Sequence, residues 1–285
     1  MKKTVLLALL ALSFFTAYGQ KRESGSLKVD GKERTWNMFL PTTLRPGAPL
    51  VMVLHGYGGS ADPRPTFEFA AEKHGFAVCY PQGLADKTGG ESWNVGYPFQ
   101  KDMDVNDVKA LCKIARAVQK RYGLSRVNAF LTGNSNGGEM CYLMAFSKQD
   151  VFRAFAPISG FLAAWIYQTM EAPRPVPVFE IHGSEDTSTP MEGDLVPKDK
   201  WGKFLPVRQA IAYFAAKDRC LQEVCDTIPG KSPENGRYIV RDRYTDGVDG
   251  MENWLHVIVH GKHSWGVDDM DTGEVVWSFF SKYLQ

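Results

Sequence analysis

The sequence has no excess of charge of either sign. Its 33 lysines and arginines almost balance its 32 aspartates and glutamates, which leaves a formal net charge of +1 at pH 7. A protein that binds the phosphates of a nucleic acid normally carries a basic patch or a strongly basic overall balance. The balanced composition therefore predicts a protein that does not bind nucleic acid.

The sequence also lacks an apolar run long enough to span a bilayer, which takes about 20 residues. Its most apolar stretch, residues 5–15, follows Lys2 and Lys3 and precedes Ala17-Tyr18-Gly19, a small-x-small cleavage pattern. These features are typical of a secretory signal peptide. We expect residues 1–19 to be a signal peptide, and the mature protein to be secreted or periplasmic with no membrane span. Cleavage would remove two lysines and change the net charge from +1 to −1.

Cysteine is scarce, with five residues in 285. Cys79, Cys112 and Cys141 fall in apolar strand or helix patterns, where a cysteine behaves as a small core residue. Cys220 and Cys225 lie close together between a helix pattern and a loop, and in an exported protein they could form a disulfide. The sequence leaves open whether these two are bonded.

Neither the cysteines nor the clustered acids indicate a metal. The pair Cys220 and Cys225 is not followed by a second ligand pair, so it is a poor zinc pattern. Asp102, Asp104 and Asp107 are expected to form the acidic first turn of a long helix, where the helix dipole favours negative charge. We therefore expect no metal and no cofactor.

The chain has no internal repeat, no linker and no low-complexity tract, so residues 20–285 are expected to form a single domain. Apolar runs at 50–54 and 76–80 are typical of strands that are covered on both faces. Strand and helix patterns alternate along the chain, which predicts an α/β fold with a mostly parallel central sheet and helices on both faces. The expected strands are at 26–40 (a hairpin turning at Asp30-Gly31), 50–54, 76–80, 126–130, 154–159, 178–181, 237–244 and 255–259. The expected helices are at 68–74, 103–122, 207–217 and 274–283, with one more after Gly137.

The most informative stretch is Gly133-Asn134-Ser135-Asn136-Gly137, which lies between a strand pattern and a helix pattern. This is G-x-S-x-G in the strand–turn–helix context of a nucleophile elbow. Glycine is needed there because the serine backbone is strained and the neighbouring chains approach closely. The arrangement predicts that Ser135 is a nucleophile.

A serine nucleophile needs a histidine base and an acid that orients it. His263 follows a strand in a Gly-containing loop, whereas His256 and His260 lie within or at the end of a strand pattern. His263 is therefore the expected base. Asp186, just after the strand that ends near His182, is the expected acid, and Glu185 is its main rival.

The oxyanion that forms on attack needs two positioned N–H donors. The first is expected from Asn136, directly after the nucleophile. The second is expected from the loop 55–59, with Tyr57 as the choice and Gly56 and Gly58 as alternatives. His55 precedes the serine and is expected to shape this loop.

These blocks together resemble carbohydrate esterase family 1, which contains feruloyl and acetyl-xylan esterases and the related polyhydroxybutyrate depolymerase-like proteins. The blocks that carry the resemblance, in order, are 54–59 (LHGYGG), 80–83 (YPQG), 92–94 (SWN), 134–138 (NSNGG), His182-Gly183 with Asp186, and 263–265 (HSW). The resemblance implies an α/β-hydrolase fold with a triad of Ser135, Asp186 and His263. One departure is Gly266, where many relatives have proline after the tryptophan.

The resemblance implies a secreted serine esterase that removes feruloyl or acetyl groups from plant polysaccharide such as xylan. Trp93 and Trp265 are candidate substrate-binding residues, since flat aromatic faces suit an aromatic acyl group or a sugar ring; the alternative is that they only pack the loops. A depolymerase-like esterase acting on aliphatic polyester is the second hypothesis. A peptidase using the same triad and a non-catalytic carbohydrate-binding protein are further alternatives.

Overall fold

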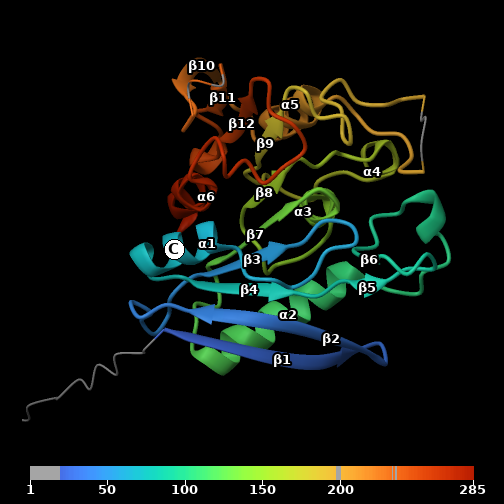
Figure 1. Ribbon diagram of the computed structural model, residues 1–285, viewed down its shortest axis with the longest axis vertical. Coiled ribbons are helices and arrows are strands. Elements are labelled where there is room, and N and C mark those ends of the chain that lie inside the picture. The colour runs from blue at the N-terminus through green and yellow to red at the C-terminus, as the bar shows by residue number, and fades with distance from the viewer. Residues whose placement is uncertain (1–19, 197–199, 233, 235) are drawn as a thin grey trace, which may run out of the picture.

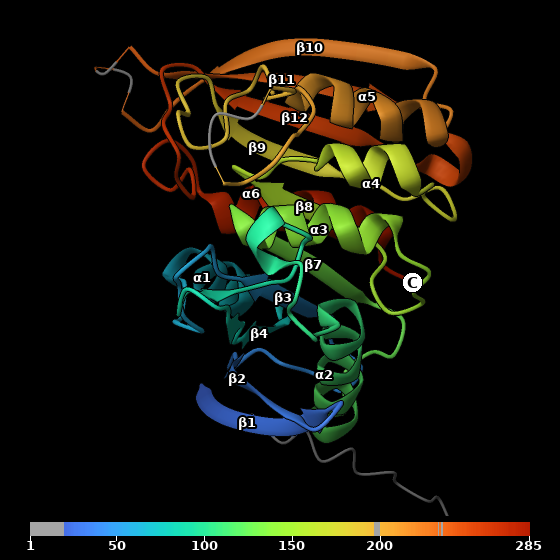
Figure 2. The ribbon, with the colours of Figure 1, turned by 90° about the vertical axis from the view of Figure 1, so that its right-hand side faces the viewer.

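The computed structural model describes residues 20–196, 200–232, 234 and 236–285 of the chain. The predicted signal peptide, residues 1–19, lies outside the described residues. Strands form a ten-stranded twisted sheet in the order β1-β2-β4-β3-β7-β8-β9-β12-β11-β10 (Figures 1 and 2). None of the described helices is both long and apolar enough to cross a bilayer.

The strands of this sheet are β1 (Lys21–Val29), β2 (Lys32–Leu40), β3 (Leu50–Leu54), β4 (Ala77–Pro81), β7 (Ala129–Asn134), β8 (Phe155–Ile158), β9 (Phe179–Gly183), β10 (Gln222–Pro229), β11 (Tyr238–Thr245) and β12 (Asn253–Ile258). A separate ribbon pairs β5 (Leu84–Ala85) with β6 (Glu91–Ser92). The helices are α1 (Pro65–His74), α2 (Asp107–Tyr122), α3 (Asn136–Phe146), α4 (Ala164–Thr169), α5 (Val207–Lys217) and α6 (Thr272–Phe280), with 3₁₀ turns η1 (Pro98–Gln100), η3 (Val248–Gly250) and η4 (Ser281–Tyr283).

The middle of the sheet is parallel. β4, β3, β7, β8, β9 and β12 are parallel to one another, whereas β2 and β1 at one edge and β11 and β10 at the other add antiparallel pairs. The predicted α/β fold with a mostly parallel sheet is confirmed. The carboxyl ends of parallel strands meet at one edge, where such folds place their sites.

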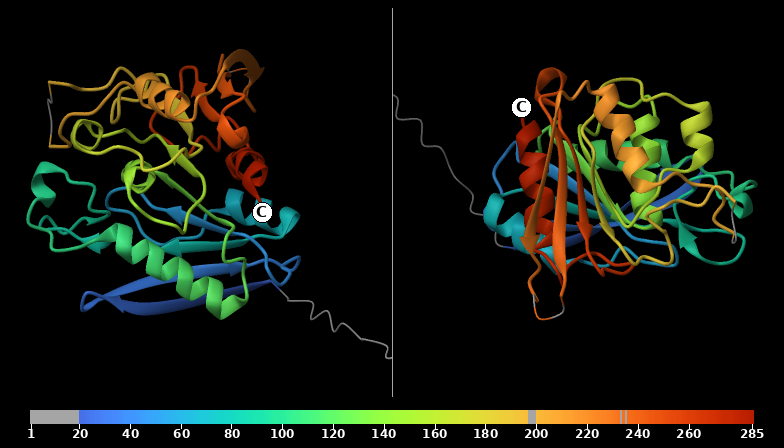
Figure 3. Two further views of the ribbon diagram at one scale, coloured as in Figure 1. Left: turned by 180° about the vertical axis from the view of Figure 1, so that it is seen from behind. Right: turned by 90° about the horizontal axis from the view of Figure 1, so that it is seen from above.

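Two apolar layers cover the two faces of the sheet. In β3, Leu50, Met52 and Leu54 pack with residues of α2, α3 and α5, whereas Val51 and Val53 pack with residues of α1 and α6. The alternation follows from the two-residue period of a strand. Figure 3 shows α6 on one side of the sheet and α3, α4 and α5 on the other.

The predicted hairpin is present, with Val29 paired to Lys32. Asp30 and Gly31 have φ values of 50° and 78°, the left-handed values of a two-residue type I′ turn. A turn of this kind matches the twist of the two strands, so the Asp-Gly pattern fixes the register.

The long helix begins later than predicted. α2 starts at Asp107, because the Asn106 side chain accepts a hydrogen bond from Lys109 N and caps the helix. Asp102 and Asp104 therefore lie before the helix rather than in its first turn. They pair instead with Lys87 and Lys32. Asp107 is buried and pairs with the buried Arg34.

The disulfide considered between Cys220 and Cys225 is not formed, and both cysteines are free. Cys220 follows α5, and its Sγ lies 3.7 Å from the Met251 carbonyl oxygen. Cys225 lies within β10, opposite Asp242 of β11. Strand pairing holds this segment extended, so the two thiols have separate partners.

Candidate active site

Ser135 lies at the junction of β7 and α3 in a strained conformation, with φ 77° and ψ −114°. An added Cβ on Gly133 would lie 2.7 Å from the Gly137 backbone, and one on Gly137 would lie 2.7 Å from the Leu54 carbonyl oxygen. Backbone atoms cannot move aside as a flexible side chain can, so both positions require glycine. The local structure is that of the predicted elbow.

The expected acid and base come together from different strand ends. Asp186 follows β9, and His263 lies in the loop after β12; His263 Nδ1 is 2.7 Å from Asp186 Oδ2. Ser135 and His263 line one cavity of about 380 Å³. The structure shows no hydrogen bond between the Ser135 hydroxyl and His263, both of which are among the described residues. Such bonds often tighten only when substrate binds.

Asp186 is held as a buried acceptor. Its Oδ1 accepts the N–H groups of Ser188 (2.8 Å) and Thr189 (2.9 Å), and its Oδ2 accepts the Thr189 hydroxyl (2.9 Å). Burial by itself would raise the pKa of Asp186, but the hydrogen bonds from His263 and Thr189 outweigh it and hold the pKa below its ordinary value. The carboxylate is therefore ionised at neutral pH and can accept from His263.

The loop that carries His263 is tied to the elbow. The Ser264 carbonyl oxygen accepts hydrogen bonds from the Asn134 side-chain amide and from the Ser159 hydroxyl, each at 3.0 Å. Gly266 has φ 72°, a value that the ring of proline cannot adopt, so this path of the loop needs a residue other than proline. Sequence reasoning did not identify Ser159; its positive φ of 47° directly after β8 is visible only in the structure.

The other histidines have structural partners. His182 is buried and lies 2.9 Å from Glu180 Oε1 and 2.7 Å from the Thr189 carbonyl oxygen, so it supports the turn that holds Asp186. His256 packs against Phe179 and Trp254, and burial lowers its pKa to about 3. His55 Nε2 accepts the Gly83 N–H at 2.9 Å, in line with the expected loop-shaping role.

Glu185, the alternative acid, pairs with His260 and not with His263. Its carboxylate lies 2.7 Å from His260 Nδ1, and both side chains are more than half exposed. This hydrogen bond lowers the pKa of Glu185. The geometry places Asp186, and not Glu185, against His263.

The loop of the expected oxyanion donors passes beside the serine, since a Cβ on Gly56 would lie 3.2 Å from Ser135 Cβ. Gly58 N donates to the Glu91 carbonyl oxygen at 2.8 Å, so the Gly58 N–H already has an acceptor and is not free to bind an oxyanion. Asn136 is the first residue of α3, where backbone N–H groups have no partner within the helix. Tyr57 and Asn136 remain the proposed donors, with Gly56 as the alternative.

Neither tryptophan expected at the substrate site lines the cavity. Trp93 is fully buried; its Nε1 donates to the His55 carbonyl oxygen at 2.9 Å, and its ring packs on the His55 ring. Trp265 packs against Phe67 and beneath Arg64 on the other face of the sheet. Both fit the alternative of packing the loops, and the substrate-binding assignments are corrected.

Aromatic residues that the sequence did not single out as a group form the cavity wall. Tyr57, Tyr97, Phe161 and Trp201 line it with Ser135. Trp201 packs edge to face on Tyr57 and Tyr97, with ring centroids 5.1 and 5.0 Å apart. Trp201 was missed because it lies in an irregular segment far from every recognised block.

One acid also lines this cavity. Glu139 lies on the first turn of α3, is fully buried, and is hydrogen-bonded to the Tyr97 hydroxyl, which also accepts from the Asn136 side-chain amide at 3.1 Å. Burial raises the pKa of Glu139 to about 8, despite opposing hydrogen bonds from Tyr97 and Asn136. The carboxyl is therefore protonated at neutral pH and gives the cavity a neutral polar group.

This shift predicts a pH dependence of stability. Between pH about 4.5 and about 8 the folded state keeps a proton on Glu139 that the unfolded state releases, so the free energy of unfolding falls as pH rises. Glu139→Gln imitates the protonated form and removes this dependence. We expect the melting temperature of the wild type to fall by roughly 2 °C or more relative to Glu139→Gln between pH 5 and 8. Parallel melting curves for the two proteins would contradict the assignment.

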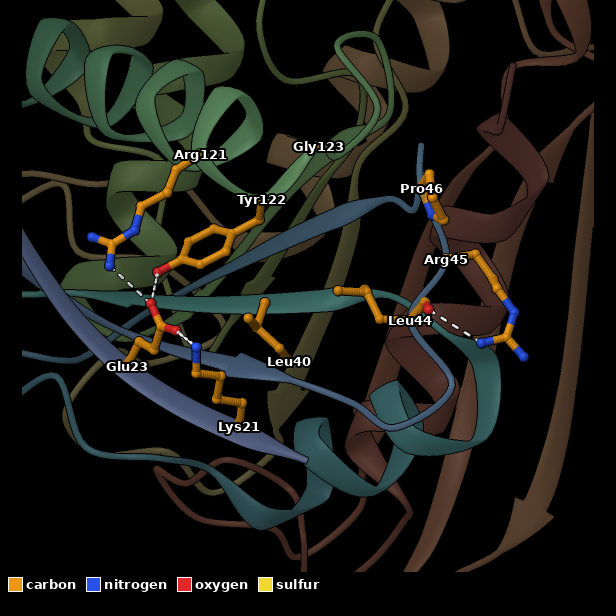
Figure 4. Close-up of a pocket in the computed structure, with 9 residues that line it drawn as sticks. All are labelled: Lys21, Glu23, Leu40, Leu44, Arg45, Pro46, Arg121, Tyr122 and Gly123. Carbon is orange, nitrogen blue, oxygen red and sulfur yellow. Dashed lines mark hydrogen bonds and ion pairs between the residues drawn. The ribbon is translucent and has the colours of Figure 1, made fainter. Parts of the chain in front are cut away.

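A second cavity, of about 450 Å³, lies near the start of β1 and the end of α2 and is lined by none of the triad residues. Figure 4 shows Glu23 bonded to Lys21, Arg121 and the Tyr122 hydroxyl. Its single carboxylate pairs with both nearby cations, and no expected site residue lines this cavity. Across the part of the chain that the structure describes, no cluster of three or more metal-ligating side chains is present.

The comparison with solved structures shows the fold. An acetyl xylan esterase from Aspergillus awamori superposes with a TM-score of 0.58 at 16% identity, over 91% of this chain and 99% of that one. The chain has the α/β-hydrolase fold. A sequence profile of the prolyl oligopeptidase family also matches residues 65–189 of the chain, a span that includes Ser135 and Asp186.

Curated relatives include esterases. The chain is 28% identical over 162 residues to a bifunctional acetylxylan esterase/xylanase, XynS20E, of Neocallimastix patriciarum, covering 56% of this chain and 22% of that protein. It is 25% identical over 231 residues to a probable feruloyl esterase C of Aspergillus oryzae, covering 78% of each. The first curated relatives are matched over less than half of their own length. The predicted resemblance to acetyl-xylan and feruloyl esterases is confirmed.

Proposed function

We propose that this α/β hydrolase is a serine esterase that removes feruloyl or acetyl groups from plant polysaccharide such as xylan, or from its oligosaccharide fragments. The observation that carries the proposal is that strained Ser135 shares a cavity with His263, whose Nδ1 is held by buried Asp186. The named relatives act on such esters, which supports the choice of substrate class.

In the proposed mechanism, His263 accepts the proton of the Ser135 hydroxyl as its oxygen attacks the ester carbonyl carbon. The N–H groups of Asn136 and Tyr57 stabilise the oxyanion, and ionised Asp186 stabilises the imidazolium. Collapse of the tetrahedral intermediate breaks the bond to the alcohol oxygen, which takes the proton from His263. Water then attacks the acyl-enzyme with His263 again as base, and releases the acid.

The aromatic wall of the cavity supports a planar acyl group. Tyr57, Tyr97, Phe161 and Trp201 give the cavity flat, apolar surfaces, and Glu139 offers a neutral hydrogen-bonding group among them. A feruloyl group has a flat ring and a polar edge, so it fits these surfaces better than a flexible aliphatic chain. Feruloyl therefore stands slightly ahead of acetyl.

A substrate panel tests the proposal. We expect kcat/KM on methyl ferulate or acetylated xylan to exceed that on a soluble hydroxybutyrate oligomer by about 10-fold or more. A preference for the oligomer would favour the depolymerase-like alternative and leave only the esterase chemistry.

A peptidase is the second candidate, because the prolyl oligopeptidase profile spans residues 65–189. The discriminating substrate is an N-blocked dipeptide nitroanilide assayed beside methyl ferulate. Turnover of the nitroanilide that exceeds turnover of every ester would overturn the esterase proposal.

Export from the cytoplasm is also proposed, on the pattern of residues 1–19.

A further inference from the structure

A groove of about 410 Å³ adjoins the catalytic cavity. The two share Tyr97 and Trp201, and the groove continues over the loop before η1 and the start of α4. Its lining is mostly apolar and contains no acidic residue, with Gln168 and Lys203 as its polar side chains. A molecule whose ester bond lies at Ser135 can therefore extend from the cavity directly into this groove.

Trp165 forms one fixed wall of the groove. It lies in the first turn of α4 and is 39% exposed. Its indole Nε1 donates to the Val95 carbonyl oxygen at 3.0 Å, and its ring covers Gly96, where an added Cβ would lie 2.9 Å from ring atoms. The hydrogen bond and the close packing hold the ring in one orientation, so it presents a rigid flat surface to whatever enters the groove.

A sugar ring matches this surface. Pyranose C–H bonds carry partial positive charge and pack on the electron-rich face of an indole, while the hydroxyl groups at the ring edge need hydrogen-bonding partners. Gln168 can donate and accept, and Lys203 can donate, from the same groove. A polysaccharide ester has its sugar on the alcohol side of the bond, so a sugar in this groove requires that side of the ester to face Tyr97 and Trp201.

We propose that the groove walled by Trp165 is a subsite for the sugar portion of the substrate. This inference rests on the proposed function, because it assumes that the alcohol side of the ester is a carbohydrate. The subsite lowers KM for sugar esters and has no effect on esters that lack a sugar.

Trp165→Ala tests the subsite, with Tyr167→Ala as the matched control. Tyr167 is on the same short helix and is 40% exposed, but it packs on Tyr213 outside the groove. For Trp165→Ala we expect KM on an acetylated xylo-oligosaccharide to rise by about 10-fold, and kcat/KM on 4-nitrophenyl acetate to stay within about 2-fold of wild type. Tyr167→Ala should change neither.

Other results would overturn the subsite. An unchanged KM for the oligosaccharide ester would show that Trp165 contacts no sugar. A selective loss on methyl ferulate would assign the groove to the acyl group, and an equal loss on all esters would indicate a structural role. Trp165→Phe keeps a flat ring and should recover most of the affinity.

Binding of unesterified xylotetraose, measured by calorimetry on intact protein, separates this inference from the proposed function. Binding by wild type and Tyr167→Ala but not by Trp165→Ala supports the subsite even if no sugar ester is hydrolysed, in which case the proposed substrate alone fails. Equal binding by all three proteins, or by none of them, overturns the subsite whatever the esterase assays show.

Discussion

Ser135→Ala is expected to lower kcat on 4-nitrophenyl acetate by about 10³-fold or more, because the oxyanion donors alone give only residual catalysis. The fold should survive. Alanine and serine have similar backbone preferences, so the strain at φ 77° is similar in both, and the Ser135 hydroxyl makes no hydrogen bond to another described residue. The melting temperature should therefore stay close to that of wild type.

Ser188→Ala is the matched control for Ser135→Ala. Ser188 lines the same cavity, but only its backbone N–H bonds to Asp186, so its hydroxyl can be removed without disturbing the acid. A fluorophosphonate probe should label wild type and Ser188→Ala once each, and should not label Ser135→Ala. Near-wild-type turnover by folded Ser135→Ala would reject the nucleophile assignment.

Asp186→Asn is expected to lower kcat by about 10⁴-fold, as in serine hydrolases whose triad acid is made neutral. The lowered pKa of Asp186 means that an ionised acceptor faces His263 Nδ1 at neutral pH. An asparagine that turns its NH₂ group toward the ring would force the other tautomer of the imidazole. The Nε2 atom would then carry a proton and could not accept one from Ser135.

Glu185→Gln is the control for Asp186→Asn. It removes a neighbouring carboxylate, which is bonded to exposed His260, and should leave kcat within about 2-fold of wild type. If Glu185→Gln lost most of its kcat while Asp186→Asn kept it, Glu185 and not Asp186 would be the acid. Both variants need melting curves, because Asp186 also holds two N–H groups of its own turn.

The sequence predicted the parts of the fold where the physical pattern is strong. Fully apolar runs identified β3 and β4, and the helical period identified α5 with the bounds observed. β10 was missed because most of its residues are exposed, so it has no alternating apolar face. α4 was missed because six residues are too few to show a helical period.

The candidate site shows the same difference between residues that a local sequence pattern identifies and residues that it does not. Ser135, Asp186 and His263 each lie at a recognisable strand end, and the structure brings them to one place. Trp93 could not be judged from sequence, since only the fold reveals that its ring fills the space beside His55. Trp165 and Trp201 carry no local pattern, and their position depends on how distant loops meet.

β12 lies inside the sheet, between β9 and β11, although it is the last strand of the chain. Its loop delivers His263, and Ser264 anchors that loop to the elbow built 130 residues earlier. A chain that has been made only as far as β11 has the proposed nucleophile, Ser135, but lacks the proposed base, His263. Under the proposed mechanism, catalysis therefore begins only when the final strand has inserted, and a chain that has not yet folded would not hydrolyse esters.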